Sequence, residues 1–234
     1  MASRIGLIGG LSWEATASYY RYFNQFFLGP SPWSQPPVLI DSTDMATIVE
    51  LQRAGDWSAT GVIMADAARR LVAGGADVLA IGANTMHRNY EEVAAAVACD
   101  VVDIRTCVAR EVISLGGESV GVLGTSYVVE QDFYARGIEA HGVEVIRPDE
   151  SQTRELQRII YDELTQGVVT TESRERLLDI AASLVARGAH VVGLCCTELG
   201  LLVDEGDAAL VVVDSTKAHV RALVSALNQD SSTP

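Results

Sequence analysis

The sequence predicts an α/β fold with two pseudo-symmetric three-layer α/β/α lobes, mainly parallel sheets, and an active site in the cleft between the lobes. Two observations lead to this fold class. Short apolar runs alternate with amphipathic segments along the whole chain, a pattern typical of parallel sheets covered by helices on both faces. In addition, the segment 188–200 resembles the segment 75–87. The distance between the two segments is too long for a solenoid repeat, so it indicates two related lobes.

The internal repeat places the ends of two predicted strands in equivalent positions. The apolar run 191–194 is typical of a buried parallel strand, and it is followed by Cys195-Cys196-Thr197-Glu198. At the same offset, the predicted strand 76–81 is followed by Ala83-Asn84-Thr85 after a single glycine. Ligands bind beyond the carboxyl ends of strands in open parallel sheets. Both segments are therefore candidate site segments.

The first predicted lobe comprises residues 1–104 together with 215–234. Its strands are short apolar runs that end at glycine or polar residues, and its helices have apolar residues at helical spacing. We expect these strands at 5–8, 37–40, 76–81 and 101–104. We expect helices from Glu14 onward and at 48–53, 59–72, 90–97 and 217–227.

The second predicted lobe comprises residues 105–214. Its first strand, 119–124, has the same apolar-Gly-apolar-apolar-Gly order as the opening strand of the chain, and a hydroxyl residue follows each of them closely. Further strands are expected at 143–146, 191–194 and 209–213. Helices are expected at 107–115, 133–140, 155–164 and 172–186, with a further one near 197–202.

Composition and charge limit the classes of function. The 234 residues are 48% hydrophobic and 21% charged, which fits a globular protein. The net charge of −14 argues against nucleic acid or an anionic membrane surface as a partner. No apolar run reaches the roughly 18 residues of a membrane helix, and the first residues do not resemble a secretion signal. We therefore expect a cytoplasmic protein whose partner is a small molecule.

Several common cofactor and metal sites lack their signatures. The four cysteines (Cys99, Cys107, Cys195 and Cys196) show no C-x-x-C spacing and the histidines are scattered, so we expect no metal and no disulfide framework. The glycines of segment 6–10 do not have dinucleotide-binding spacing, and neither a phosphate-binding loop nor a G-x-S-x-G motif occurs. We expect no nucleotide cofactor.

Cys196 is the candidate for chemistry. It follows a buried strand, its neighbours Thr197 and Glu198 are polar, and the N-terminus of the expected helix at 197–202 would favour the thiolate. The alternative is a small buried apolar residue, which is what most unpaired cysteines are. The preceding Cys195 is expected to point the other way, into packing.

Three motifs, taken in order along the chain, carry a resemblance to a known family. They are Ile5-Gly-Leu-Ile-Gly-Gly-Leu-Ser-Trp-Glu-Ala-Thr16, Asn84-Thr-Met-His87 and Cys196-Thr-Glu-Leu-Gly-Leu-Leu202. Over nearly its whole length the chain resembles the aspartate/glutamate racemase family of cofactor-independent enzymes, and its broad or dual-specificity branch above all. The resemblance implies an isomerase that acts on an amino acid or dicarboxylate, without pyridoxal phosphate or metal, and a homodimer.

The resemblance also implies a mechanism, from which this sequence departs at one position. The family uses two cysteines, one from each half, because inversion needs an acid and a base on opposite sides of a planar carbanion. Cys196 matches the second-half cysteine, but the first-half position is Ala83, which carries no exchangeable proton. The alanine could replace a natural Cys or Thr, or another group could act there, such as Thr85, His87 or an ordered water.

Two further alternatives remain open. The chain could perform one-sided chemistry on a small carboxylic acid, similar to the arylmalonate decarboxylase branch of the superfamily, or it could bind an amino acid without turnover. By position, the resemblance implies that Gln52 and Arg53 lie near the substrate's side-chain carboxylate. Asn84 and Thr85 could instead cap a helix, Arg53 could be a surface residue and His87 structural. The substrate-binding candidates are Ser12, Gln52, Asn84, Thr85, Thr125 and Thr197.

Overall fold

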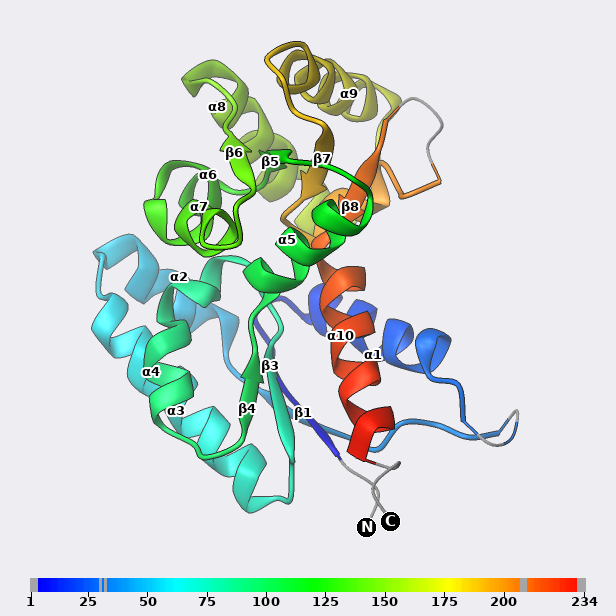
Figure 1. The fold of residues 1–234 in the computed structure, drawn as a ribbon. Helices are drawn as coiled ribbons and strands as arrows, with labels where there is room; N and C mark the ends of the chain where they lie inside the picture. The colour runs from blue at the N-terminus through cyan, green and yellow to red at the C-terminus, as the bar shows by residue number, and fades with distance from the viewer. Residues whose placement is uncertain (1–3, 30, 32, 207–209, 231–234) are drawn as a thin grey trace. The chain divides into compact units, whose positions relative to one another are not determined.

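A computed structural model describes residues 4–29, 31, 33–206 and 210–230. The chain divides into two compact units, one formed by Met1–Asp103 with His219–Pro234 and the other by Ile104–Ala218. Among the residues that the structure describes, each unit contains one four-stranded sheet whose strands are all parallel. The predicted α/β class with parallel sheets is confirmed (Figure 1).

The first unit has strand order β2-β1-β3-β4. Its strands are β1 (Ile5–Gly9), β2 (Val38–Ser42), β3 (Val78–Ile81) and β4 (Asp100–Val102). Its helices are α1 (Trp13–Phe26), α2 (Met45–Ala54), α3 (Trp57–Ala73), α4 (Tyr90–Ala95) and most of α10 (Ser215–Asp230), with the 3₁₀ helix η1 (Thr85–Asn89).

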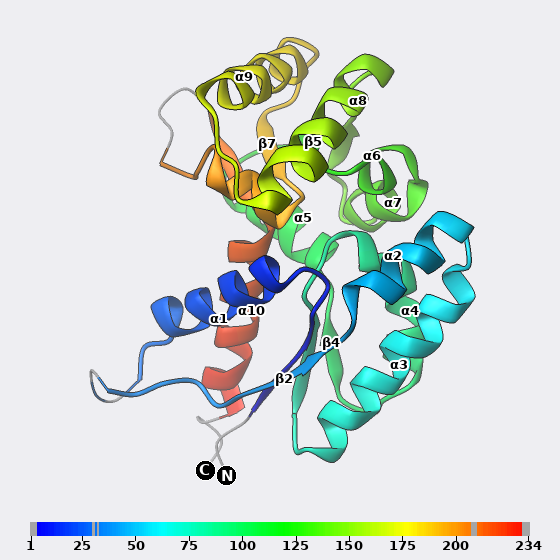
Figure 2. The ribbon, with the colours of Figure 1, turned by 180° about the vertical axis from the view of Figure 1, so that it is seen from behind.

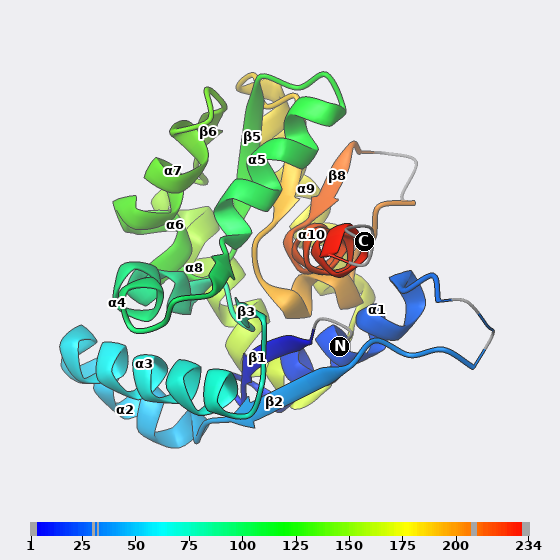
Figure 3. The ribbon, with the colours of Figure 1, turned by 60° about the horizontal axis from the view of Figure 1, so that its bottom comes forward.

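Helices cover both faces of the first sheet. On one face, Ile8 and Ile81 pack with side chains of α2, α3 and α4, while on the other Leu7 and Ala80 pack with α1 and α10. Neighbouring residues of a strand point to opposite faces, so each strand contributes to both cores. Figures 2 and 3 show the same arrangement, with α2 and α3 on one side of the strands and α1 and α10 on the other.

The second unit has strand order β6-β5-β7-β8. Its strands are β5 (Ser119–Leu123), β6 (Glu144–Ile146), β7 (Val191–Leu194) and β8 (Val212–Asp214). Its helices are α5 (Ile104–Ser114), α6 (Ser126–Glu130), α7 (Asp132–Glu139), α8 (Glu150–Arg158) and α9 (Thr171–Ala186). A π-helical turn, η2 (Ile159–Glu163), and two 3₁₀ helices, η3 (Leu164–Gln166) and η4 (Thr197–Leu201), complete it.

The same close packing of a helix on the first strand occurs in both units. A Cβ added to Gly6 of β1 would lie 2.8 Å from the Cβ of Ala76 and 3.2 Å from that of Leu71 on α3. A Cβ added to Gly121 of β5 would lie 2.8 Å from the Cβ of Leu184 on α9. Both glycines therefore allow the helix before the next central strand to approach the sheet. This shared contact agrees with the internal repeat seen in the sequence.

Some elements differ from the sequence-based expectations. Helix α8 begins at Glu150 rather than 155, because Asp149 caps it: its side chain accepts from the Gln152 amide, and the Gln152 side chain accepts from the Asp149 amide. The expected helix near 197–202 is a short 3₁₀ helix, and the start of the expected strand 209–213 lies outside the described residues. Among the described residues, no helix is long and apolar enough to cross a membrane.

Candidate active site

In the first unit, the predicted site residues follow two adjacent strands. Strands β1 and β3 are paired with Ile8 beside Ile81, and the Gly82 amide then donates to the Ile8 carbonyl at 2.9 Å. Ser12 follows β1 after a short turn, and the segment from Ala83 to Thr85 follows β3 directly. Because both strands run parallel, these residues leave the same edge of the sheet. We call them, with Gln52, the first half-site.

Ser12 is held in an unusual backbone conformation. Its φ is 138°, and it is the one non-glycine residue with positive φ among those described. Its hydroxyl accepts from the Ala15 amide at 3.1 Å and caps α1, and its carbonyl accepts from the Thr16 hydroxyl at 3.0 Å. Such strain is concentrated at functional sites in proteins, which favours a binding role for this turn.

Asn84 and Gln52 bring two elements of the first unit together. Asn84 is buried and its side chain makes no capping hydrogen bond to η1, so capping does not account for it. Gln52 on α2 is also buried, and its Nε2 lies 3.1 Å from the Sδ of Met86 on η1. Arg53, by contrast, is exposed. Gln52 is thus adjacent to the segment that carries Ala83, whereas the neighbouring arginine points to the surface.

His87 fixes the backbone at Ala83. Its Nδ1 lies 2.9 Å from the Ala83 carbonyl oxygen, so Nδ1 carries the proton and donates it. The ring is 1% exposed and stacks on Tyr90 with 6.3 Å between ring centroids. A ring so buried, with Nδ1 bound to the chain, positions residue 83 and does not present a free acid to a ligand. This geometry supports a structural role for His87.

A second buried histidine next to His87 had no signal in the sequence. His219 on α10 donates from Nε2 to the Val102 carbonyl at 2.9 Å, so its Nδ1, 2.8 Å from the Tyr19 hydroxyl, accepts the hydroxyl proton. Its ring meets that of His87 edge-on at 5.7 Å between centroids. Burial, and then the neighbouring His87, lower the pKa of His219 to about 3. This imidazole is therefore neutral at pH 7 and joins α1, α10 and the end of β4.

The second unit repeats the arrangement at its own central strands. Strands β5 and β7 pair with Leu123 beside Leu194, and the Cys195 amide donates to the Leu123 carbonyl at 2.7 Å. This is the bond that Gly82 makes in the first unit, so Cys196 occupies in its unit the place that Ala83 occupies in the other. Thr125 follows β5, is buried, and makes no side-chain cap to α6. Thr125, Cys196, Thr197 and Glu198 form what we call the second half-site.

The thiol of Cys196 lies beside a carboxylate. Its Sγ is 3.2 Å from Oε2 of Glu198, and the same oxygen accepts from the Thr197 hydroxyl at 2.6 Å. Both Cys196 and Glu198 are buried, with exposed fractions of 8% and 6%. Burial, followed by the charge of Glu198, raises the pKa of Cys196 well above its ordinary value. The expectation of a thiolate favoured by a helix N-terminus was therefore wrong, since burial and the Glu198 carboxylate outweigh the Glu198 backbone amide, which lowers the pKa of the thiol.

Cys195 has a different environment from that of its neighbour. It is fully buried, and its pKa is raised to about 12, chiefly by burial. Its surroundings include the hydroxyl of Tyr134 and the carboxylate of Asp214, which caps the first turn of α10 by accepting from the amides of Thr216 and Lys217. Cys195 therefore belongs to the packing between β7 and its neighbours.

Tyr161 packs near the second half-site, and the sequence did not single it out. It lies on η2 and packs against the apolar cluster that contains Cys196 and Leu199. Burial and the nearby Cys196, Tyr127 and Glu198 raise its pKa to about 12, so the phenol is neutral at pH 7. A lone tyrosine in an amphipathic helix gave no signal. Among the described residues, no group of three or more His, Cys, Asp or Glu side chains is arranged to hold a metal ion.

Comparisons with known proteins connect this geometry to a family. A model of the Asp/Glu/hydantoin racemase family matches residues 8–223. The chain is 23% identical over 225 residues to the broad specificity amino-acid racemase RacX of Bacillus subtilis, a match covering 94% of this chain and 96% of that protein.

Two solved structures are more similar to this chain. A candidate Asp/Glu racemase from Yersinia pestis has a TM-score of 0.89 and 36% identity, over 97% of this chain and 100% of that one. An aspartate racemase homologue from Pyrococcus horikoshii has a TM-score of 0.84 and 31% identity, again over 97% and 100%. The fold is therefore that of Asp/Glu racemase structures, and the predicted class of isomerase is confirmed. The chain belongs to the Asp/Glu/hydantoin racemase family.

Proposed function

We propose that this protein is a cofactor-independent amino-acid racemase that acts on aspartate- or glutamate-type substrates by proton transfer at Cα, with Cys196 as an acid/base group. The observation that carries the proposal is the buried pair of Cys196 Sγ and Glu198 Oε2, 3.2 Å apart, at a strand end in a chain of the racemase family. The names of its relatives, an aspartate racemase homologue and a broad specificity amino-acid racemase, support this substrate class.

The state of Cys196 defines its first role. A thiol whose pKa is raised by burial and by Glu198 is protonated at pH 7, so it donates its proton to a carbanion at Cα. The C–H bond then forms on the Cys196 side, and the sulfur is left as a thiolate beside Glu198. In the reverse direction the thiolate removes the α-proton. The first half-site supplies amide and hydroxyl donors, Ser12, Asn84 and Thr85, to hold the substrate carboxylate and the developing enediolate.

The proposed racemisation needs a second acid/base group on the face of the substrate opposite Cys196, and the strand end equivalent to that of Cys196 carries Ala83, which has no thiol. Of the groups considered for this face, His87 is buried and its Nδ1 proton is bound to the Ala83 carbonyl. Thr85 is only partly buried, so Thr85 or a water held by it is the better-placed proton carrier. A weak acid at this face makes the proton transfer slow, and loss of one such group typically costs on the order of 10²–10⁴ in rate.

Ala83 also favours a second candidate function. With one sulfur and a methyl group in the two equivalent positions, the protein could protonate a carbanion from one side only, as a decarboxylase or isomerase of a small carboxylic acid does. A protein that binds an amino acid without turnover is the third candidate. The predictions of a cytoplasmic location and a homodimer stay predictions.

One experiment separates these candidates. The protein is incubated with L-aspartate, L-glutamate and a panel of other amino acids in D₂O, while NMR follows the α-proton signal and chiral chromatography follows the enantiomers. Exchange with inversion supports the racemase, and exchange with retention supports one-sided chemistry at Cys196. Binding without exchange supports the third candidate, a protein that binds an amino acid without turnover. Dialysis against a chelator and treatment with hydroxylamine should leave exchange unchanged, since the proposed chemistry uses side chains alone.

A further inference from the structure

The turn that follows α8 is wider than a regular helix. In η2 the Leu164 amide donates to the Ile159 carbonyl, five residues back, as in a π-helix. Ile159 and Ile160 are buried, and Tyr161 packs against the same apolar cluster. Consecutive side chains of a regular α-helix are about 100° apart, so three in a row would spread around the helix. The widened turn instead directs Tyr161 toward the cluster that contains Cys196.

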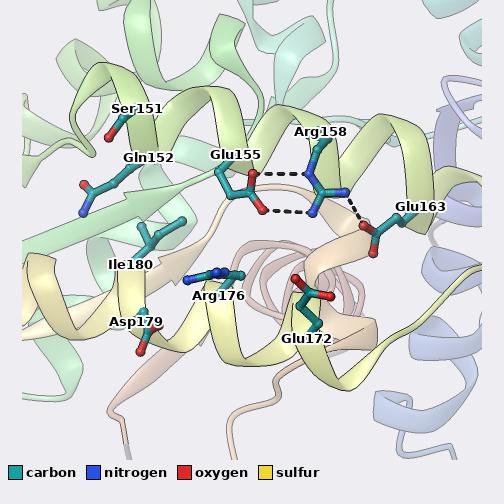
Figure 4. A pocket seen from close by; sticks show the side chains of 9 residues that line it. All are labelled: Ser151, Gln152, Glu155, Arg158, Glu163, Glu172, Arg176, Asp179 and Ile180. Atoms are coloured by element: carbon teal, nitrogen blue, oxygen red, sulfur yellow. Dashed lines mark hydrogen bonds and ion pairs between the residues drawn. The ribbon is translucent and has the colours of Figure 1, made fainter.

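The outer side of this turn is anchored to α9. Arg158 bonds to Glu155 at 2.9 Å and also to Glu163, and the Ser173 hydroxyl donates to Glu163 as well. Figure 4 shows Arg158 between these two carboxylates, in a groove of ≈ 640 Å³ between α8 and α9. Glu163 is thus held by Arg158, the last residue of α8, and by Ser173 in the first turn of α9. These contacts fix the position of the turn.

A hydrogen-bond relay determines how the Tyr161 hydroxyl is used. Oε1 of Gln157 accepts from the Ser126 amide at 2.9 Å, so the other terminus of that side chain, Nε2, is the donor in its bond to Tyr161. The phenol oxygen therefore accepts from Gln157, and its own proton is left to be donated. Tyr161 packs against the cluster that contains Cys196, and the charges of Cys196 and Glu198 both act on its phenol.

We propose that Tyr161 is a substrate-contacting residue, which donates a hydrogen bond to a carboxylate oxygen of the amino acid bound beside Cys196. The inference rests on the proposed function and adds a second-unit contact to it. A neutral phenol suits this position because it can hold an anion close to Glu198 without a positive charge, which would lower the thiol's proton affinity. The turn η2 is then the element that determines where the substrate carboxylate lies relative to the thiol.

The test replaces Tyr161 with Phe in the full chain, with Tyr20→Phe on the exposed side of α1 as the matched control. NMR titration gives the Kd for L-aspartate and L-glutamate, and α-proton exchange in D₂O gives KM and kcat. Loss of a hydrogen bond to a charged group should raise Kd and KM about ten- to a hundredfold, with a smaller change in kcat. The control should match the wild type, and both variants should unfold at the wild-type temperature.

The outcomes distinguish this inference from the proposed function. Wild-type exchange combined with an unchanged Kd and KM in Tyr161→Phe would overturn the contact and leave the racemase proposal standing. An unchanged Kd with a shifted pH profile of exchange would show that the phenol donates to Glu198 or Cys196 instead, which also overturns it. If the wild type binds the amino acid without exchanging its α-proton, the Kd tests the contact: a raised Kd in Tyr161→Phe supports it, and an unchanged Kd overturns it. A wild type that neither binds nor exchanges would overturn both proposals.

Discussion

Oε2 of Glu198 lies 3.2 Å from Sγ of Cys196 and also accepts the hydroxyl of Thr197, so one buried carboxylate oxygen serves two donors. This contact distinguishes the second half-site from a simple reactive-cysteine site. A nearby cation or helix N-terminus would lower the pKa of a thiol, whereas burial and then this carboxylate raise the pKa of Cys196. The resting form of Cys196 is therefore the protonated acid. The predictions below follow from this relationship and from the equivalent geometry of the two units.

The first prediction concerns the charge of Glu198. Glu198→Gln removes the anion beside the thiol, so the pKa of Cys196 should fall toward its ordinary value. The rate of Cys196 alkylation by iodoacetamide, followed peptide by peptide with mass spectrometry, should therefore rise at a lower pH than in the wild type. Cys99, which is partly exposed and belongs to the other unit, provides the internal control. Identical pH profiles in the two proteins would mean that Glu198 does not control the thiol.

The second prediction concerns Ala83, at the strand end equivalent to that of Cys196. Ala83→Cys restores a thiol at the place equivalent to Cys196 and should raise the rate of racemisation by about 10²-fold or more, because an efficient acid/base group then acts there. Chiral chromatography of L-aspartate or L-glutamate measures the rate. Ala54→Cys, at an exposed alanine at the end of α2, is the control for an added thiol. No gain in Ala83→Cys would count against the proposal that residue 83 takes the place of the second acid/base group.

The third prediction concerns acid stability. His219 has a folded-state pKa of about 3, below its value in the unfolded chain, so the unfolded state binds more protons between pH 6.5 and pH 3. The contribution of the neutral His219 to the free energy of unfolding is complete above pH 6.5. It is lost as the pH falls, at about 1.4 kcal/mol per pH unit. Measured by urea unfolding, the free energy of unfolding of the wild type should fall more steeply with decreasing pH than that of His219→Gln, and the difference should equal this slope. Equal slopes would mean that His219 is not buried as a neutral imidazole.

The fourth prediction uses the paired glycines. Gly6→Ala and Gly121→Ala each place a methyl group against a packed helix, so each should lower the free energy of unfolding by about 1–3 kcal/mol. Urea titrations of the two variants measure the loss. Gly55→Ala tests a different cause, since that position has open space but a φ of 73°. Two variants as stable as the wild type would contradict the close approach of α3 and α9 to their sheets.

The sequence predicted the fold well where periodicity and repeats carry the information. The strand ends at Ala83 and Cys196 follow from apolar runs and from the internal offset, and the structure gives them equivalent hydrogen bonds. What the sequence did not reveal are contacts set by tertiary packing. No local pattern indicates that Glu198 turns back onto Cys196, that His219 reaches the end of β4, or that a π-turn directs Tyr161 inward. Burial and the first of these contacts both raise the pKa of the Cys196 thiol.

The central claim is that Cys196 transfers the proton at Cα, and its most direct test is α-proton exchange of L-aspartate and L-glutamate in D₂O. Cys196→Ser is compared with Cys195→Ser, which removes the adjacent, fully buried thiol. If both variants remain folded, exchange should fall by about 10²–10⁴-fold in Cys196→Ser and should persist in Cys195→Ser. Exchange at the wild-type rate in Cys196→Ser would contradict the account.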